Sequence, residues 1–215
     1  MSLDVIKALV EKEEKVLGLS DGSTKVIAVS KLQPNDRVRH VLDSGHRVFG
    51  ENRVQEALRK WPEFKNKYDG VELHLLGPLQ RNKVRQAMSL FDYIHTVDSL
   101  KLVKKIAEIR DEISFCPKLF IQVNIGNEEQ KSGISLEEVQ NLYNNCLKLD
   151  LNVIGLMCLP PLDNKTSTYF KNIKNMNDNL SMNELSIGMS NDYLEAVEFK
   201  ATFLRIGTKI FGDRD

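Results

Sequence analysis

The stretch Val26-Ile27-Ala28-Val29-Ser30-Lys31 is a short apolar run that ends in a lysine, and the turn residues Leu32-Gln33-Pro34-Asn35 follow it at once. A short apolar run bounded by a turn is typical of a buried β-strand. An amine at its end would lie where a barrel strand opens. Later apolar runs also end in polar or glycine signatures: Phe49-Gly50-Glu51-Asn52, Gly77-Pro78-Leu79-Gln80, Asn124, Met157-Cys158-Leu159-Pro160, Gly188-Met189-Ser190 and Arg205-Ile206-Gly207-Thr208. This regularity predicts strand ends that converge on one site.

The apolar runs predict eight short strands, at residues 25–30, 47–50, 72–76, 92–95, 118–124, 152–158, 184–187 and 202–206. Helix-like stretches lie between them, near 35–44, 52–66, 80–89, 99–112, 135–149, 166–181 and 190–198. A further helix near 3–18 precedes the first strand. This alternation favours an α/β fold, a single (β/α)8 TIM barrel with an extra N-terminal helix, over an open doubly wound sheet. No GxGxxG fingerprint supports the open sheet, and we expect residues 1–215 to form one domain.

The composition is that of an ordinary globular protein, with 41% hydrophobic and 28% charged residues. The 30 basic and 30 acidic residues cancel, so the chain lacks the positive field that a nucleic-acid partner requires. No stretch approaches the roughly 20 apolar residues of a membrane span. The start of the chain lacks a secretory leader, which predicts a cytoplasmic location. Three widely spaced cysteines are expected to be reduced thiols.

Two glycine signatures fall where barrels of this type often bind phosphate, in the loops after strands 7 and 8. Ser190 can cap the next helix while its hydroxyl faces an anion. Gly207 and Thr208 offer a close backbone approach and a second hydroxyl. The alternative is that Ser190 is only a helix cap and the glycines are only turn residues. Their occurrence after two consecutive strands favours a phosphate site.

Lys31 complements a phosphate site, because a lysine partly removed from water at a barrel mouth has a lowered pKa and can form a Schiff base. The ligand implied by these groups is a phosphorylated aldehyde. The alternative is an ion-paired lysine, or one whose apolar stem alone is buried.

Several motifs carry a family resemblance that runs in order from about Val26 to the C-terminus. Together they resemble the pyridoxal phosphate homeostasis proteins, also called the YggS or PROSC family. The motifs are Ala28-Val29-Ser30-Lys31, Phe49-Gly50-Glu51-Asn52, His74-Leu75-Leu76-Gly77-Pro78-Leu79-Gln80 with Asn82-Lys83, Gly155-Leu156-Met157, Gly188-Met189-Ser190 with Asp192, and Arg205-Ile206-Gly207-Thr208 with Phe211-Gly212.

The resemblance implies a single barrel, similar to the N-terminal domain of alanine racemase, that holds pyridoxal 5′-phosphate (PLP) as an internal aldimine. Carried over by position, Lys31 would be the Schiff-base lysine. Arg205 would face the pyridine nitrogen, and Asn52 would lie near the ring and its 3-hydroxyl. The phosphate would be held by Ser190, Gly207 and Thr208.

Two further residues match the family, and for both we favour a role other than ligand binding. His74 lies inside the third predicted strand and is expected to be a core histidine. Lys131 follows the fifth strand, where it would meet ligand or, by default, be a solvated lysine.

A cation beside the pyridine nitrogen opposes its protonation and makes the cofactor a weak electron sink. In the resembling racemase a tyrosine from an additional β-domain supplies a second base, and here the chain ends at Phe211-Gly212-Asp213-Arg214-Asp215, after the last strand. We therefore expect a non-enzymatic, monomeric PLP-binding protein. It would buffer or deliver PLP, with apo-PLP enzymes as further partners, and so affect amino-acid and keto-acid balance.

Three enzyme classes remain as rivals. The first is a low-activity PLP-dependent amino-acid racemase. The second is a Schiff-base aldolase for sugar phosphates, which would have no use for Arg205. A metal hydrolase is disfavoured because the four histidines form no HxH or HExxH spacing.

Overall fold

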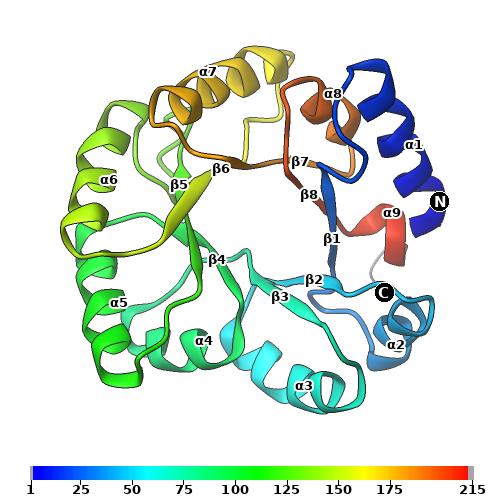
Figure 1. Cartoon of the computed structure of the whole chain (residues 1–215), viewed down its shortest axis with the longest axis horizontal. Coiled ribbons are helices and arrows are strands. Elements are labelled where there is room, and N and C mark those ends of the chain that lie inside the picture. The colour runs from blue at the N-terminus through cyan, green and yellow to red at the C-terminus, as the bar shows by residue number, and fades with distance from the viewer. Residues whose placement is uncertain (1, 213–215) are drawn as a thin grey trace.

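The computed structural model describes residues 2–212, and within them eight parallel strands close into a barrel in sequence order. Figure 1 looks down on this ring. Its strands are β1 (Lys25–Val29), β2 (Val48–Glu51), β3 (Glu72–Leu75), β4 (Tyr93–Val97), β5 (Lys118–Val123), β6 (Val153–Cys158), β7 (Glu184–Met189) and β8 (Phe203–Ile206). The ring closes because β1 pairs with both neighbours, Ala28 lying opposite Phe49 of β2 and Ile206 of β8. The predicted TIM barrel is confirmed.

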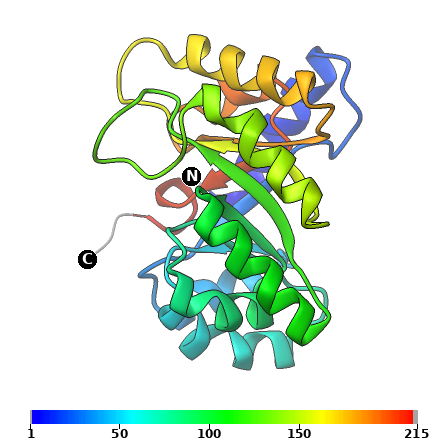
Figure 2. The ribbon, with the colours of Figure 1, turned by 90° about the vertical axis from the view of Figure 1, so that its left-hand side faces the viewer.

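Helices surround the barrel, and Figure 2 shows from the side how they cover its outer face. They are α1 (Leu3–Val16), α2 (Asn35–Asp43), α3 (Val54–Lys67), α4 (Val84–Leu90), α5 (Leu100–Ile113), α6 (Val139–Lys148), α7 (Thr166–Asn179), α8 (Tyr193–Glu198) and α9 (Thr208–Phe211), with 3-10 turns at Arg81–Lys83 and Leu136–Glu138. Among the described residues, no helix is long and apolar enough to cross a membrane.

The extra N-terminal helix α1 packs against α8 (Figure 1) and is tied to the start of β1 by one buried carboxylate. Glu14 accepts hydrogen bonds from the backbone N–H of Thr24 at 2.6 Å, from that of Gly22 at 3.1 Å and from the Ser23 hydroxyl at 3.0 Å. Three donors satisfy this buried charge, as burial of a carboxylate requires.

Each predicted strand is present within two residues of its expected bounds. Two details near the end of the chain differ from prediction. The helix expected from residue 190 begins at Tyr193 and follows Asp192, so Ser190 is not its cap. A short helix, α9, follows β8, where no helix was expected. Asp213 to Asp215, part of the predicted chain end, lie outside the described residues.

Aromatic and imidazole side chains fill the interior of the barrel, which also contains other buried polar groups. Side chains alternate along a strand, so Phe203 and Arg205 of β8 both point inward. The His95 ring stacks on Phe120 at 4.2 Å and the His74 ring stacks on Tyr93 at 4.2 Å. This packing fills the barrel beneath its C-terminal end, and the polar residues above it face an open cavity.

Candidate functional site

A cavity of about 330 Å³ lies at the C-terminal ends of the strands. This is the end at which barrels of this type carry their sites, and the volume is in the range of small-molecule pockets. The residues that line it come from β1, β2, β3 and β6 to β8 or the loops after them: Val29, Lys31, Asn52, Leu76, Leu159, Leu162, Met189, Ser190, Asn191, Asp192, Arg205, Gly207 and Thr208.

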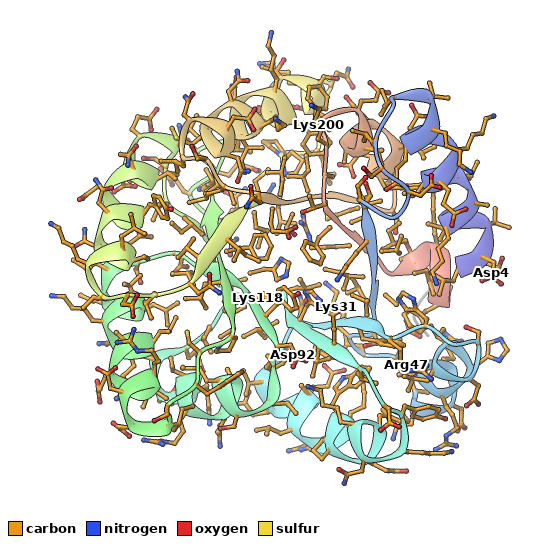
Figure 3. All side chains as sticks on the ribbon, in the orientation of Figure 1. Asp4, Lys31, Arg47, Asp92, Lys118 and Lys200 are labelled. Carbon is orange, nitrogen blue, oxygen red and sulfur yellow. The ribbon has the colours of Figure 1, made fainter. Side chains whose placement is uncertain are left out.

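The structure brings all six predicted site residues to this one cavity. They are Lys31, Asn52, Ser190, Arg205, Gly207 and Thr208. Lys31 follows β1 by one intervening residue and is half-buried, and Figure 3 places it near the centre of the ring. The six residues converge because parallel strands present all their C-terminal ends at one rim.

The loops after β7 and β8 meet through two hydroxyl groups. Thr208 Oγ1 donates a hydrogen bond to Ser190 Oγ at 3.1 Å. Since the α8 helix follows Asp192, which accepts from the Met189 N–H at 2.6 Å, the Ser190 hydroxyl is not used as a helix cap. The first N–H groups of α9, after Gly207, have no carbonyl partners within that helix. Hydroxyls and backbone N–H groups together suit a phosphate.

Gly188 lets β7 end as it does. Its φ is +87°, and a Cβ here would lie 2.6 Å from Ala196 Cβ and 2.8 Å from Leu204 Cδ2. Only glycine combines this conformation with such close packing. The register between β7 and β8 shifts at the same place, between Ser186 and Met189, and the chain then turns so that Ser190 lines the cavity.

Asn52, directly after β2, is placed by an equally close contact. A Cβ on Gly77, two residues after β3, would lie 2.1 Å from the Asn52 carbonyl oxygen. A side chain at residue 77 would therefore push Asn52 out of position. The glycine of the Gly77-Pro78 signature has a packing role that supports the site.

Arg205 is a buried cation, only 5% exposed, at the inner end of the cavity lining. Its guanidinium donates to Ser186 Oγ at 2.7 Å and to the Cys158 carbonyl at 2.7 Å. Burial lowers the pKa of Arg205 to about 10, so the group stays charged at neutral pH. It presents a fixed positive charge to any ligand in the cavity.

A hydrogen-bonded chain runs from Arg205 into the barrel through Ser186, His95 and His74. His95 Nδ1 lies 2.9 Å from Ser186 Oγ, and His95 Nε2 lies 2.9 Å from His74 Nδ1. Burial lowers the pKa of both imidazoles well below the usual value, and Arg205 adds to the effect at His95, so both rings are neutral. We call these four residues the inner chain. His74 is a core histidine as predicted, but it belongs to a network that ends at the site.

Comparison with known proteins places these features in a family. The family model described as "Alanine racemase, N-terminal domain" matches residues 3–215. The pyridoxal phosphate homeostasis protein of Aquifex aeolicus is 34% identical, over 95% of this chain and 93% of that protein. The protein of the same name from Escherichia coli K12 is 35% identical, over 92% of this chain and 89% of that protein. The chain belongs to the pyridoxal phosphate homeostasis protein family.

Solved structures agree with this membership. PipY of Synechococcus elongatus, solved with PLP bound, superposes with a TM-score of 0.82 at 34% identity and covers 95% of this chain and 100% of that chain. Alanine racemase of Clostridium difficile superposes with a TM-score of 0.71 at 15% identity over 96% of this chain and 56% of its own. The racemase likeness concerns the fold alone.

Some residues of this homeostasis-family site were not assigned a role from the sequence. Ser186 and His95 carry no motif, and only their inward positions on β7 and β4 hint at a role. Asp192 lines the cavity, and its place in the Gly188-Met189-Ser190 signature was the available signal. Among the described residues, no group of three or more His, Cys, Asp or Glu is placed to hold a metal ion.

Lys131 differs from the expectation of a solvated lysine. It is half-buried and ion-paired with Glu128, and its Nζ donates to the Pro160 carbonyl at 3.1 Å. It does not line the cavity. Lys131 therefore joins the loops after β5 and β6 at the rim of the site.

Proposed function

We propose that this protein binds PLP as a Schiff base on Lys31 and serves intracellular PLP homeostasis by buffering or delivering the cofactor. One observation carries the proposal: a single cavity is lined by a lysine, two hydroxyls at a helix start and a buried arginine. The names of the relatives and the PLP in PipY support the same ligand.

The residues present fit each part of PLP. Ser190, Thr208 and the first N–H groups of α9 would bind the phosphate. Arg205 would donate to the pyridine nitrogen, and Asn52 would face the ring and its 3-hydroxyl. Lys31 would supply the amine that bonds to the aldehyde carbon. When bound, PLP supplies an electron-withdrawing ring and a reactive aldehyde.

Arg205 favours storage over turnover. A guanidinium that stays charged at neutral pH disfavours a second positive charge on the pyridine nitrogen beside it. An unprotonated ring withdraws electrons weakly, which suppresses carbanion chemistry at a bound amino acid. Among the described residues that line the cavity there is no tyrosine to serve as a second base for racemisation. The protein is therefore proposed to be a carrier and not an enzyme.

The setting of this function is also proposed. We expect a cytoplasmic monomer in which residues 1–215 form one domain, and apo-PLP enzymes as the recipients of PLP. A cavity open at the barrel end would let PLP leave without a domain movement.

Absorbance spectroscopy tests the binding site. The parent protein should show a band at about 420 nm, and borohydride should fix a PLP adduct to Lys31, which peptide mass spectrometry would locate. Lys31→Ala should lack both. A parent protein that takes up no PLP contradicts the proposal.

Transfer and turnover are tested separately. An apo-enzyme should recover PLP from the loaded protein faster than from the free PLP released in the same time. Amino-acid racemisation above that of free PLP, abolished by Lys31→Ala, would instead assign a racemase.

A further inference from the structure

Lys60 of α3 is a buried ammonium whose three donors are all used, one of them by the residue that precedes Lys31. It is 7% exposed and donates to the Ser30 carbonyl at 3.0 Å, to Glu51 Oε1 at 3.0 Å and to Glu56 Oε1 at 3.1 Å. An ammonium has three N–H donors, so this set is complete. The Ser30 carbonyl belongs to the peptide group that precedes Lys31.

Glu56, one helical turn before Lys60, binds the peptide group on the other side of Lys31. Its Oε1 accepts a hydrogen bond from the Leu32 N–H at 2.6 Å. The two peptide groups that flank Lys31 are thus both bound to one Glu56–Lys60 ion pair on α3.

The turn that carries Lys31 needs such support. The Gln33 N–H donates to the Ser30 carbonyl at 3.1 Å, which makes Ser30 to Gln33 a β-turn with Lys31 second and Leu32 third. Leu32 has a φ of +59°, a conformation that this turn position usually reserves for Gly or Asn. Its side chain is 62% exposed, so core packing does not hold it there. The bond to Glu56 does.

Glu51, at the end of β2, anchors the ion pair to the barrel. Its Oε1 accepts from the Ser30 hydroxyl at 2.8 Å and from Trp61 Nε1 at 3.0 Å, as well as from Lys60. Burial raises the pKa of Glu51, and Lys60 opposes that shift. The carboxyl therefore joins β1, β2 and α3 at the strand end from which Lys31 projects.

We propose that Glu56 and Lys60, anchored by Glu51, are positioning residues that orient Lys31 for its bond to the cofactor aldehyde. This inference rests on the proposed function. In the step concerned, the neutral Lys31 amine adds to the aldehyde carbon, and one water molecule leaves as the C=N bond forms. The three residues, which we call the Lys31 clamp, act through the backbone of the turn on either side of Lys31.

The test compares three readouts in Glu56→Ala, Glu56→Gln, Lys60→Met and the parent. They are the rate of Schiff-base formation with PLP, the affinity for pyridoxamine 5′-phosphate, which has no aldehyde, and the hydrogen exchange of the Leu32 amide without ligand. Arg59→Met is the matched control, because Arg59 is an exposed cation next to Lys60 on the same helix.

We expect Glu56→Ala to slow Schiff-base formation about tenfold, the scale at which misorientation affects a bond-forming step. Pyridoxamine 5′-phosphate should bind with less than a twofold change in affinity, because the phosphate loops are intact. The Leu32 amide should exchange about tenfold faster or more. Glu56→Gln should restore both rates, since its amide oxygen still accepts from Leu32. Lys60→Met should slow the bond as Glu56→Ala does, and Arg59→Met should match the parent.

Equal losses for PLP and pyridoxamine 5′-phosphate in Glu56→Ala would mean general damage and overturn the proposal. An unchanged rate of bond formation would overturn it as well. If the parent forms no Schiff base, the proposed function fails. The hydrogen exchange of the Leu32 amide then tests by itself whether the clamp holds the turn. An unchanged exchange rate in Glu56→Ala would show that Glu56 does not hold it.

Discussion

Lys31 and Arg205 line the same cavity but are held by opposite means. Lys31 lies on a half-buried turn with a left-handed neighbour, and charged groups on an outer helix hold that turn through its backbone. Arg205 lies on a strand inside the barrel, and neutral groups hold its side chain directly. The group proposed to bond to the cofactor is thus placed by a turn, whereas the group proposed only to supply charge is built into the core.

The comparison implies that neither network supplies most of the ligand affinity, which should come from the phosphate end. The double substitution Ser190→Ala and Thr208→Val removes the two hydroxyls proposed to contact the phosphate, and each such hydrogen bond to an anion is worth about 1.5–3 kcal/mol. PLP affinity should fall by about 100-fold or more. Equilibrium titration measures the loss, and Thr208→Ser, which keeps the hydroxyl, is the control. A loss below about fivefold would place the phosphate elsewhere.

The inner chain should affect stability more than reactivity. His95→Phe keeps a ring against Phe120 but leaves Ser186 and His74 without this partner. The free energy of unfolding should fall by about 1–3 kcal/mol, the cost of unpaired buried polar groups. Urea denaturation measures the change, and the rate of Schiff-base formation should stay within about threefold of the parent. A slowed rate with normal stability would reverse the assignment of the two networks.

Acid should destabilise the protein through its buried histidines, two of which belong to the inner chain. Burial lowers the pKa of His46 to about 4 and those of His74 and His95 well below normal. Unfolding frees these rings to bind protons below about pH 6.5, so stability is full above that pH and falls as pH decreases toward 4, by about 1.4 kcal/mol per pH unit for each histidine.

The free energy of unfolding between pH 7.5 and 5 checks this slope. His95→Phe should flatten it, whereas a substitution at the exposed His40 should leave it as in the parent. Stability that is constant down to pH 5 would contradict neutral buried histidines.

The smallest effect is expected at Gly207, where the strand that carries Arg205 ends beside the strand that precedes Lys31. A Cβ at Gly207 would lie 3.3 Å from the Val29 carbonyl oxygen, at the point where the ends of β8 and β1 meet. Gly207→Ala should weaken PLP binding about threefold, the effect of a shift of a few tenths of an ångström near a phosphate. The same titration checks it, and wild-type affinity would mean that the structure accommodates the added Cβ without moving the phosphate loop.

Most of the barrel and six of the residues that line the cavity could be predicted from the chain itself. Short apolar runs separated by amphipathic stretches determine strands and helices locally. The polar signature after each run then identifies the rim, because parallel strands end on one side. Ser190 was predicted to cap the next helix, but Asp192 directly precedes that helix. The prediction was wrong because local signals do not say which of several polar residues in a loop starts the helix.

The sequence by itself determined the order of the elements, the rim on which Lys31 and Arg205 lie and the family to which the chain belongs. Only the tertiary structure decided what holds these residues. His95 meets Ser186 across 91 positions of sequence, and Lys60 meets the Ser30 carbonyl across 30. Such contacts leave no periodic trace in the chain, because they depend on which inward and outward faces the closed barrel brings together.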